Sequence, residues 1–388
     1  MDAAEREGLR PKGNVPNLRF PEFQEEWEKC RLGDVCTFLS GGTPKIDVKE
    51  YWNGTIPFVS AISMHDTYIL DSKLHISEEG LKHGSRLLTK DNLLLLVRGS
   101  MLWNTIPICL NKNDVAFNQD VKGIIANDTI NNEFLLYWLK SKEQRLKYMV
   151  TGTGLGAGKL DTSDLLSMIV YIPAMKEQDK VARLLSLFDE RIATQNKIIE
   201  DLKKLKSAIS ENLFKAVKGD VVILSEICEI IKGKQVNGEF LSEKGKYYVM
   251  NGGTEQSGYY SDYNVEANTI SISEGGNSCG YVQFNTSPFW SGGHCYTIQK
   301  IADNVDNLYL YHYLKSKEDA IMNLRIGSGL PNIQKKDLAI FKIKIPTAKQ
   351  QKVISTFLSS LERKAEIEEI LLNAMKKEKQ YLLRQMFI

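Results

Sequence analysis

Residues 150–160 read VTGTGLGAGKL, and four glycines followed by a lysine are residue types that could cradle a phosphate. A P-loop needs Gly, four residues, then Gly-Lys-Ser/Thr, because backbone N–H groups wrap the phosphates and the hydroxyl binds Mg²⁺. Counting back from Gly158-Lys159, the first glycine position holds Thr153 and the hydroxyl position holds Leu160. The segment fails the pattern at both ends, and no nucleotide site is predicted.

Other catalytic patterns are also missing from the sequence. An adenine methyltransferase needs an Asn/Asp-Pro-Pro-aromatic motif around the extruded base, and the chain has no Pro-Pro pair. It also has no Pro-Asp, with which the common metal-dependent nuclease motif begins. The histidines form neither a His-Glu-x-x-His motif nor a His/Cys ligand cluster. We therefore predict no catalytic residue and no metal-binding residue in this chain.

Composition leaves the class of partner open. The 388 residues are 43% hydrophobic and 25% charged, as in ordinary globular proteins, and the net charge is only +2. Any basic surface must therefore be local. Six cysteines without a C-x-x-C motif predict reduced thiols, and neither a signal peptide nor a membrane-length apolar run is visible. We expect a cytoplasmic protein that has no contact with a membrane.

The chain contains one sequence pattern twice. LKSKEQRLKYMVTGTGL at 139–155 aligns without gaps with LKSKEDAIMNLRIGSGL at 314–330, and after a two-residue deletion the match continues to Phe214 and Phe387. Upstream, LGDVCTFLSGG at 32–42 resembles LSEICEIIKGK at 224–234. The second glycine segment lacks the Gly-Lys pair, so both segments are interpreted as structural turns.

Each half is expected to begin with a mixed part and to end in a long helix. The strand candidates are LLLLVR at 93–98, TISIS at 269–273, GYVQF at 280–284 and CYTIQ at 295–299. Asn132 and Asn307 can cap helices formed by EFLLYWLKSKEQRLKYM and LYLYHYLKSKEDAIMNL. The predicted fold class is α+β, with two pseudo-repeated α/β domains separated by two long helices.

The long helices are predicted from about Lys176 to Lys218 and from Lys349 to Ile388. Each follows a proline, contains no proline or glycine before its end, and carries apolar residues at helical spacing. A single helix cannot bury such a stripe, so we expect the two to pack as an antiparallel coiled coil. The alternative, in which each helix folds back on its own globular part, stays open.

Two similar globular parts on paired helices suit a target with two reading positions, such as successive major grooves of DNA. Four segments are distinctive: the VPNLRFPEF lead-in with Trp27, LGDVCTFLSGGTPK, and the helix entries YIPAMKEQDKVARLLSLFDERI and IKIPTAKQQKVISTFLSSLERK. With these segments and this layout, the chain resembles the specificity (S) subunits of Type I restriction–modification systems. The resemblance covers nearly the whole chain.

The resemblance implies a non-catalytic subunit. Each target-recognition domain would read one half of a bipartite DNA site in the major groove, and the paired helices would set the spacer. Two modification (methyltransferase) subunits would dock along the helices, and restriction (motor-nuclease) subunits would join them. Adenine methylation or cleavage would then use S-adenosylmethionine, ATP and Mg²⁺ in those partners, with no cofactor in this chain.

The repeat and the resemblance together predict five parts of the chain. These are an N-terminal extended arm (1–26), target-recognition domain 1 (27–172), a central long helix (173–218), target-recognition domain 2 (219–346) and a C-terminal long helix (347–388).

Candidate base-reading residues are polar loop residues, because Arg and Lys pair with guanine, and Asn and Gln with adenine, in the major groove. In the first domain they are Lys45, Arg98, Asn104, Asn118, Gln119 and Lys159. In the second they are Lys234, Asn251, Gln256, Asn277, His294 and Gln334. For any single one of them, a solvated loop side chain or a turn former is an equally good interpretation.

Apolar residues outside the main stripe suggest a second buried face on the helices, for binding partners. They are Leu185, Leu187, Ile199, Leu358 and Ile370. Two other classes of function stay open: a methyltransferase or nuclease that acts alone, and a repeat scaffold that binds only proteins.

Overall fold

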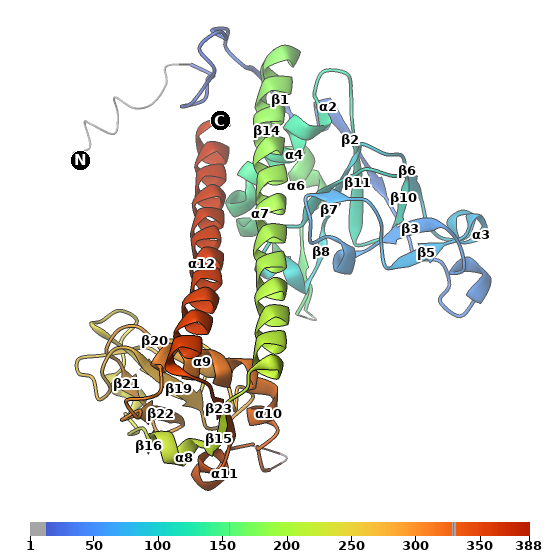
Figure 1. The fold of residues 1–388 in the computed structure, drawn as a ribbon. Coiled ribbons are helices and arrows are strands. Elements are labelled where there is room, and N and C mark those ends of the chain that lie inside the picture. The colour runs from blue at the N-terminus through green and yellow to red at the C-terminus, as the bar shows by residue number, and fades with distance from the viewer. Residues whose placement is uncertain (1–12, 155, 328, 330) are drawn as a thin grey trace. The chain divides into compact units, whose positions relative to one another are not determined.

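The computed structural model describes residues 13–154, 156–327, 329 and 331–388, and it divides into two units (Figure 1). The first unit combines residues up to 195 with residues 371–388, and the second contains residues 196–370. Residues 1–12 of the predicted arm lie outside the described residues, and 13–27 contain no helix or strand. Mixed helix and sheet in two similar units confirms the predicted α+β class.

The first unit is built on a five-stranded sheet in the order β2-β11-β7-β9-β4. Its strands are β2 (Cys36–Ser40), β4 (Tyr68–Ile69), β7 (Leu93–Leu96), β9 (Ile108–Asn111) and β11 (Val121–Ala126). Neighbours are antiparallel except β4 and β9. β7 is buried on both faces, which explains why its sequence is an unbroken leucine run and not an alternating one.

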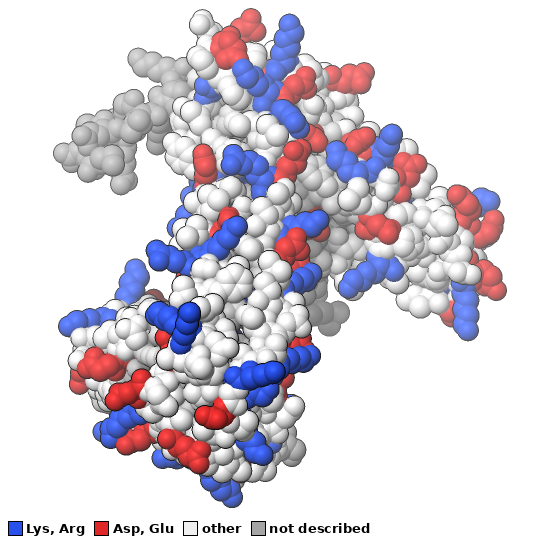
Figure 2. Space-filling model, in the orientation of Figure 1, with Lys and Arg blue, Asp and Glu red and all other residues white. Residues whose placement is uncertain are grey.

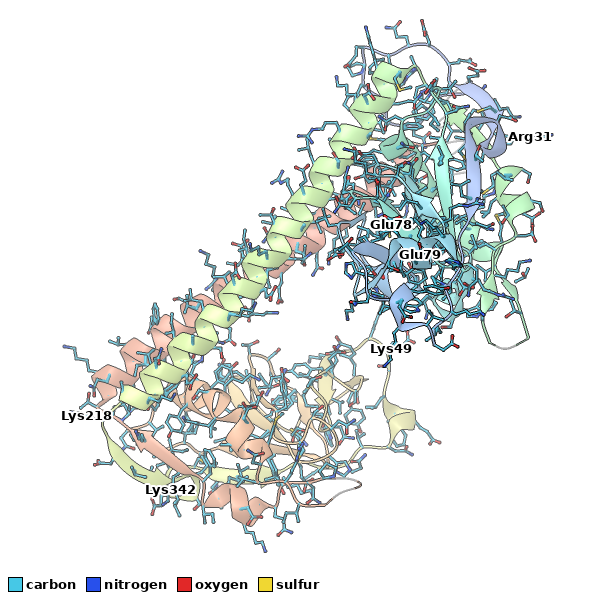
Figure 3. All side chains as sticks on the ribbon, turned by 90° about the vertical axis from the view of Figure 1, so that its right-hand side faces the viewer. Arg31, Lys49, Glu78, Glu79, Lys218 and Lys342 are labelled. Carbon is cyan, nitrogen blue, oxygen red and sulfur yellow. The ribbon has the colours of Figure 1, made fainter. Side chains whose placement is uncertain are left out.

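Smaller sheets surround this centre. One has the order β5-β3-β10-β6, another pairs β1 with β14, and a third has the order β12-β13-β8. The strands are β1 (Glu28–Arg31), β3 (Ile56–Val59), β5 (Leu74–Ile76), β6 (Leu87–Leu88), β8 (Arg98–Gly99), β10 (Val115–Phe117), β12 (Thr151–Gly152), β13 (Gly158–Lys159) and β14 (Ile169–Ile172). The short helices are α2 (Leu32–Val35), η1 (Lys49–Tyr51), η2 (Ala61–Ser63), α3 (Glu78–Lys82), η3 (Ser100–Trp103), α4 (Asn132–Ser141), α5 (Glu143–Tyr148) and α6 (Thr162–Leu166). Lys49 of η1 and Glu78 and Glu79 of α3 are exposed on this part of the unit (Figure 3).

The second unit repeats this plan with fewer strands. Its central sheet has the order β16-β22-β19-β20, beside the sheets β18-β17-β21 and β15-β23. The strands are β15 (Asp220–Ile223), β16 (Glu229–Lys232), β17 (Tyr247–Met250), β18 (Tyr259–Tyr260), β19 (Thr269–Ser273), β20 (Val282–Asn285), β21 (Trp290–Ser291), β22 (Cys295–Gln299) and β23 (Lys342–Ile345). The short helices are α8 (Leu224–Ile227), η4 (Gly238–Phe240), α9 (Asn307–Ser316), α10 (Glu318–Met322) and α11 (Lys335–Ala339).

Two sequence expectations need correction. The side chains that cap α4 and α9 are Asn131 and Asp306, one residue before those predicted, because they accept hydrogen bonds from the N–H groups of Phe134 and Tyr309. Each segment expected to form one helix also forms two, which break after the Lys-Ser pair that both copies share.

The two long helices are α7 (Met175–Ala216) and α12 (Ala348–Gln385), and each unit contains a part of both. In the first unit Asp189 of α7 forms an ion pair with Lys379 of α12. In the second unit Lys206 of α7 pairs with Glu362 of α12 at 2.7 Å. Lys203 of α7 also pairs with Glu369 of α12 in the second unit, so a later residue of α7 meets an earlier residue of α12, and the helices are antiparallel there, as predicted.

The end of each long helix completes a hydrophobic core. Phe387, which follows α12, is 5.2 Å from Phe134 in the core of the first unit, measured between ring centroids. Phe214 of α7 lies 5.2 Å from Tyr313 in the core of the second unit. The core of each unit is therefore closed by the helix that the other repeat contributes.

A buried glutamine fixes the start of each long helix. Gln178 accepts a hydrogen bond from the N–H of Asn131 at 2.7 Å and donates to the carbonyl oxygens of Thr129 and Pro173. Gln351 makes the same three contacts with Asp306, Asn304 and Pro346. This duplicated contact joins the helix to the loop before α4 or α9, so the sequence repeat is also a repeat of structure.

Candidate nucleic-acid interface

Three loops meet at one edge of the central sheet in each unit, because the end of β7, the start of β11 and the end of β2 lie side by side in antiparallel strands. The same holds for β19, β22 and β16. We call this the variable edge. It comprises these three loops and a fourth segment that pairs with one of them. In the first unit these are residues 41–45, 97–104, 118–120 and 158–159. In the second they are residues 232–235, 274–277, 292–294 and 332–334.

Arg98 and Lys159 are brought together in the first unit. They are directly opposite each other in the antiparallel pair of β8 and β13, and both are exposed. Lys159 also donates to Asp161 at 3.3 Å. Hydrogen bonds from Ser163 and from Lys159 lower the pKa of Asp161 to about 2, so this carboxylate is charged at neutral pH. Two adjacent cations with one counter-charge form a local basic site in a nearly neutral chain.

The glycine segment is a hairpin between β12 and β13. Gly154 and Gly156 have φ angles of +80° and +78°, which side chains with a Cβ rarely adopt. A Cβ at Gly158 would lie 2.6 Å from Cγ1 of Val150. Backbone geometry and packing therefore explain these glycines, as the sequence repeat predicted.

The two other predicted loops lie beside Arg98. The carbonyl oxygen of Asp120 accepts from the N–H groups of Val97 and Arg98, which places Asn118 and Gln119 next to the basic pair. Gln119 accepts a hydrogen bond from Thr43 at 2.7 Å, two residues before Lys45. Lys45, Arg98, Asn118, Gln119 and Lys159 thus form one connected surface.

Asn104 follows η3, where the preceding residue, Trp103, is more informative. Its indole N–H donates to the carbonyl oxygen of Gly156 at 3.0 Å, and half of the residue remains exposed. An exposed tryptophan beside two cations is a stacking surface suited to nucleic acid. Sequence reasoning missed it, because its exposure depends on the hairpin that it contacts 53 residues later.

In the second unit three predicted residues converge. Asn251 accepts a hydrogen bond from the N–H of His294 at 3.2 Å. Lys234 donates its N–H to the carbonyl oxygen of Ser291, which pairs with Met250 just before Asn251. All three lie at the edge formed by β16, β22 and β17.

The remaining predictions for the second unit are more scattered. Asn277 follows Gly276, whose N–H binds the carbonyl oxygen of Pro331, and Gln334 precedes α11. Both are exposed and belong to the variable edge. Gln256 instead donates to the hydroxyl of Tyr259 at 2.9 Å in the loop before β18.

The tyrosines of the second unit pack mainly against aromatic neighbours. Tyr248 stacks on Phe289 at 5.5 Å, and Tyr260 meets Trp290 edge-on at 4.9 Å, between ring centroids. Tyr247 lies 4.8 Å from Tyr263. These contacts between aromatic rings stabilise the domain.

Sequence reasoning also missed Lys232 and Glu274. Glu274 is 7% exposed, and one of its oxygens accepts from Lys232 at 2.6 Å and from the hydroxyl of Tyr296 at 3.0 Å. In SEGG the residue looks like a turn former, and its burial follows only from pairing with Lys232, 42 residues earlier.

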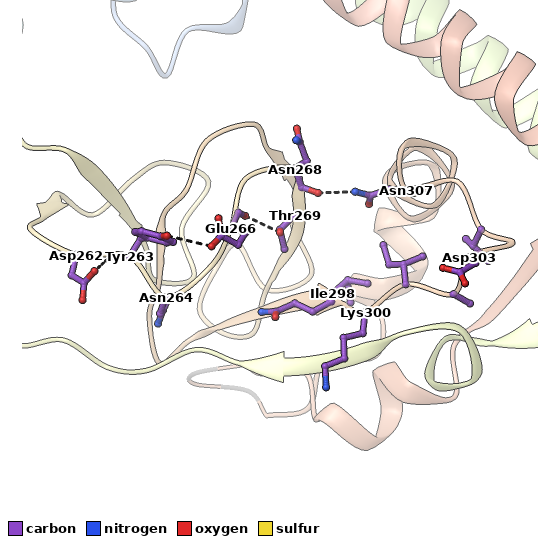
Figure 4. Close-up of a pocket in the computed structure, with 14 residues that line it drawn as sticks. Asp262, Tyr263, Asn264, Glu266, Asn268, Thr269, Ile298, Lys300, Asp303 and Asn307 are labelled. Atoms are coloured by element: carbon purple, nitrogen blue, oxygen red, sulfur yellow. Dashed lines mark hydrogen bonds between the residues drawn. The ribbon is translucent and has the colours of Figure 1, made fainter.

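The opposite edge of the second sheet carries an open pocket of about 830 Å³ (Figure 4). Its polar groups bind one another: Asn307 donates to the carbonyl oxygen of Asn268 at 2.6 Å, and Tyr263 donates to Glu266 at 3.3 Å. No group of His, Cys, Asp and Glu that could hold a metal ion occurs among the described residues.

The five residues predicted to bind partners differ in exposure. Leu185 and Leu358 are fully buried in the cores of their own units, and Ile199 is 7% exposed. Leu187 and Ile370 are exposed. Three of the five therefore pack inside their own units, and two are free to contact a partner.

Acidic and basic side chains intermingle on the face drawn in Figure 2, in keeping with the small net charge. The pair of Arg98 and Lys159 is one local basic site. Among the described residues, no helix is long and apolar enough to cross a membrane.

A family model described as the Type I restriction modification DNA specificity domain matches residues 24–204 and again residues 217–377. The chain belongs to this family. The two matches correspond to the two copies of the sequence repeat.

Specificity subunits are also the relatives that the chain matches. That of the Escherichia coli Type I restriction enzyme EcoR124I/EcoR124II is 30% identical over 189 residues, which is 48% of this chain and 46% of that protein. The putative MjaX specificity subunit of Methanocaldococcus jannaschii is 24% identical over 92% of this chain and 91% of its own length. The chain thus spans about half the length of some curated relatives and most of another.

Solved structures agree on the fold. The Type I restriction-modification S subunit from M. genitalium has a TM-score of 0.67 and 19% identity, and the alignment covers 96% of this chain and 99% of that one. At this identity the likeness concerns the fold, and the family model is what assigns the chain to its family.

Proposed function

We propose that this chain is the DNA-specificity subunit of a Type I restriction–modification complex in the cytoplasm. Each unit reads one half of a bipartite site through the major groove, and catalysis takes place in partner subunits. The observation that carries the proposal is the contrast inside the repeat: the packing contacts are duplicated, while the residues at the variable edge differ. Two units of this kind suit two different half-sites on one duplex.

The first half-site is assigned to the edge around Arg98 and Lys159, and the second to the edge around Lys234, Asn251 and His294. Arg and Lys donate to O6 and N7 of guanine, and Asn accepts from and donates to adenine. The exposed Trp103 adds an aromatic surface beside the first edge.

The long helices set the spacer and dock two modification subunits, and restriction subunits join this complex. The exposed Leu187 and Ile370 belong to the docking surface. The partners use S-adenosylmethionine, ATP and Mg²⁺, because methyl transfer and DNA translocation need groups for which this chain has no motif.

The test is to express the chain with its modification subunits and to map N6-methyladenine across the genome of the host. We expect one asymmetric motif with two short specified segments and an unspecified gap of constant length. The chain expressed alone is the control, and it should methylate nothing.

Each alternative function gives a different result. Methylation or cleavage by the purified chain alone would support an enzyme. Stable complexes with proteins but no DNA footprint would support a protein-only scaffold.

The spacer role has its own test, in which seven helix-favouring residues are inserted at both 195/196 and 370/371. These points divide the units, so the contacts inside each unit stay in place. Seven residues add about 10 Å of helix, close to three base pairs of B-DNA. We expect unchanged half-sites with a longer gap. An unchanged gap in an active complex would contradict the proposal that the helices set the spacer.

A further inference from the structure

The second unit contains a buried charge network at its variable edge, centred on Glu274. The residue is 7% exposed, and both of its backbone polar groups are bound: its N–H donates to the carbonyl oxygen of His294, and its carbonyl oxygen accepts from the N–H of Ile333. Oε1 accepts from Lys232 and from Tyr296. Oε2 lies 3.6 Å from Nδ1 of His294, and it has no hydrogen-bond partner among the described residues.

The repeat shows that the fold does not require this carboxylate. The N–H of Val97 binds the carbonyl oxygen of Asp120, as the N–H of Glu274 binds that of His294. The N–H of Leu160 binds the carbonyl oxygen of Val97, as that of Ile333 binds Glu274. Glu274 therefore occupies the position of Val97, an ordinary buried residue of the first core.

Burying a carboxylate costs free energy that a valine at the same position does not cost, even when the carboxylate is paired. One oxygen without a hydrogen bond adds to that cost. A residue that weakens the folded state at a position where valine suffices is expected to serve recognition.

The partners of Glu274 reach the surface. The side chains of Lys232 and His294 are 51% and 63% exposed, while that of Glu274 is 10% exposed. An ammonium group has three N–H donors, and Glu274 accepts from one of them, so the other two remain available to a ligand. The buried carboxylate thus holds the exposed lysine in place and lies beside the exposed histidine.

We propose that Glu274 is a positioning residue for sequence readout, which holds Lys232 so that its free N–H donors meet the acceptors of a guanine in the second half-site. Guanine presents N7 and O6 in the major groove, and both are acceptors. His294 is the neighbouring contact. This inference rests on the proposed function and adds Lys232 and Glu274 to its reading residues.

The equivalent positions of the first unit have different chemistry. Ser40 and Lys122 face each other on β2 and β11, as Lys232 and Tyr296 do on β16 and β22. Lys122 donates to Ser40 at 2.5 Å. The first unit has no carboxylate at the position of Glu274, so its edge presents a different set of donors.

The experiment uses the complete complex with its partner subunits and maps methylated sites for Glu274→Gln, Lys232→Ala and Lys232→Arg. We expect the first two variants to lose discrimination at one guanine of the second half-site by at least about tenfold, with the first half-site and the gap unchanged. Lys232→Arg keeps the donors and should retain the preference for guanine.

The matched control is Glu229→Gln, which breaks the exposed ion pair with Lys300 at the opposite edge of the same sheet. It should leave the motif unchanged. Glu274→Val introduces the residue type that the first unit has at this position. We expect this variant to fold and to lose the preference for the same guanine. Melting temperatures of all variants separate misfolding from altered readout.

Two results would overturn the inference: an unchanged motif for both Lys232→Ala and Glu274→Val, or a weakening that is equal at every position of the site. If the unmodified complex gave no bipartite motif at all, the proposed function itself would fail, and that outcome is distinct.

Discussion

The two units of this chain have similar interiors and different edges. Inside, Gln178 and Gln351 make the same three hydrogen bonds, and Phe387 and Phe214 fill matching places in the two cores. At the variable edge the first unit pairs two cations across strands, whereas the second unit buries a carboxylate between a lysine and a tyrosine. Within one chain, repetition thus marks what the fold needs, and divergence marks the surface that we propose reads the target.

The largest effect is expected from the two phenylalanines that close the cores. Phe214→Ala should destabilise the second unit, and Phe387→Ala the first, by about 3–5 kcal/mol each, because a large buried side chain is lost and a cavity is left. Hydrogen exchange measured by mass spectrometry should show faster exchange in residues 196–370 for Phe214→Ala only. Equal effects of both variants on both units would contradict the separate cores.

Next is Arg98→Ala, which should weaken discrimination in the first half-site by up to about 3 kcal/mol if the guanidinium binds a base. The second half-site should keep its sequence. Arg145→Ala, an exposed residue of α5 in the same unit, is the control. A loss equal on all sequences would instead assign Arg98 to a phosphate.

A pH effect should distinguish the units. Burial lowers the pKa of His312 to about 4, and Nε2 lies 2.8 Å from the hydroxyl of Ser359. The charged groups near it are Glu362, Lys206 and Asp306. The unfolded chain, with a pKa near 6.5, binds more protons between these values, so stability falls as the pH falls through this window.

Between pH 7.5 and 5 the expected loss is about 2 kcal/mol, and it should appear in the second unit, because Tyr137 replaces the histidine in the first. Denaturant midpoints with local hydrogen exchange measure it. His312→Asn should remove this part of the pH dependence. An identical pH profile in the variant would show that other groups are responsible.

The smallest effect is expected for Lys203→Ala. Lys203 pairs with Glu369 at 2.6 Å, but the two side chains are 62% and 44% exposed, and such pairs contribute below about 1 kcal/mol. Lys206→Ala should cost more, because its pair with Glu362 is less exposed and Glu362 also accepts from Tyr311. Chemical denaturation of both variants gives the comparison, and a larger loss for Lys203→Ala would contradict it.

The strands and helices that were predicted correctly are those whose formation depends on residues nearby in the sequence. TISIS and CYTIQ form strands with the predicted bounds, since both are rich in β-forming residues, and both long helices begin within one residue of the prediction. The run LLLLVR instead ends its strand at Leu96, because Arg98 turns away to pair with the glycine hairpin. That pairing depends on a contact 61 residues away, which no local pattern contains.

The candidate site was predictable in the same uneven way. Polar types at loop positions pointed to Arg98, Lys159 and His294, which lie at the variable edges. Gln256 is also a polar loop residue, and its side chain is bound to Tyr259 of β18. The local sequence did not single out Trp103 or Glu274. Exposure and burial at these positions result from tertiary contacts, and periodicity does not report them.

The order of synthesis gives the exchanged helix ends a further consequence. The first unit is complete in the nascent chain up to residue 195, except for residues 371–388, which are translated only after the whole second unit. Until then the place of Phe387 beside Phe134 is empty, and Leu18 has no carbonyl partner at Gln385. The first unit to leave the ribosome should thus be the last to become protected from proteases, and a chain shortened by its last few residues should be degraded from its amino-terminal half.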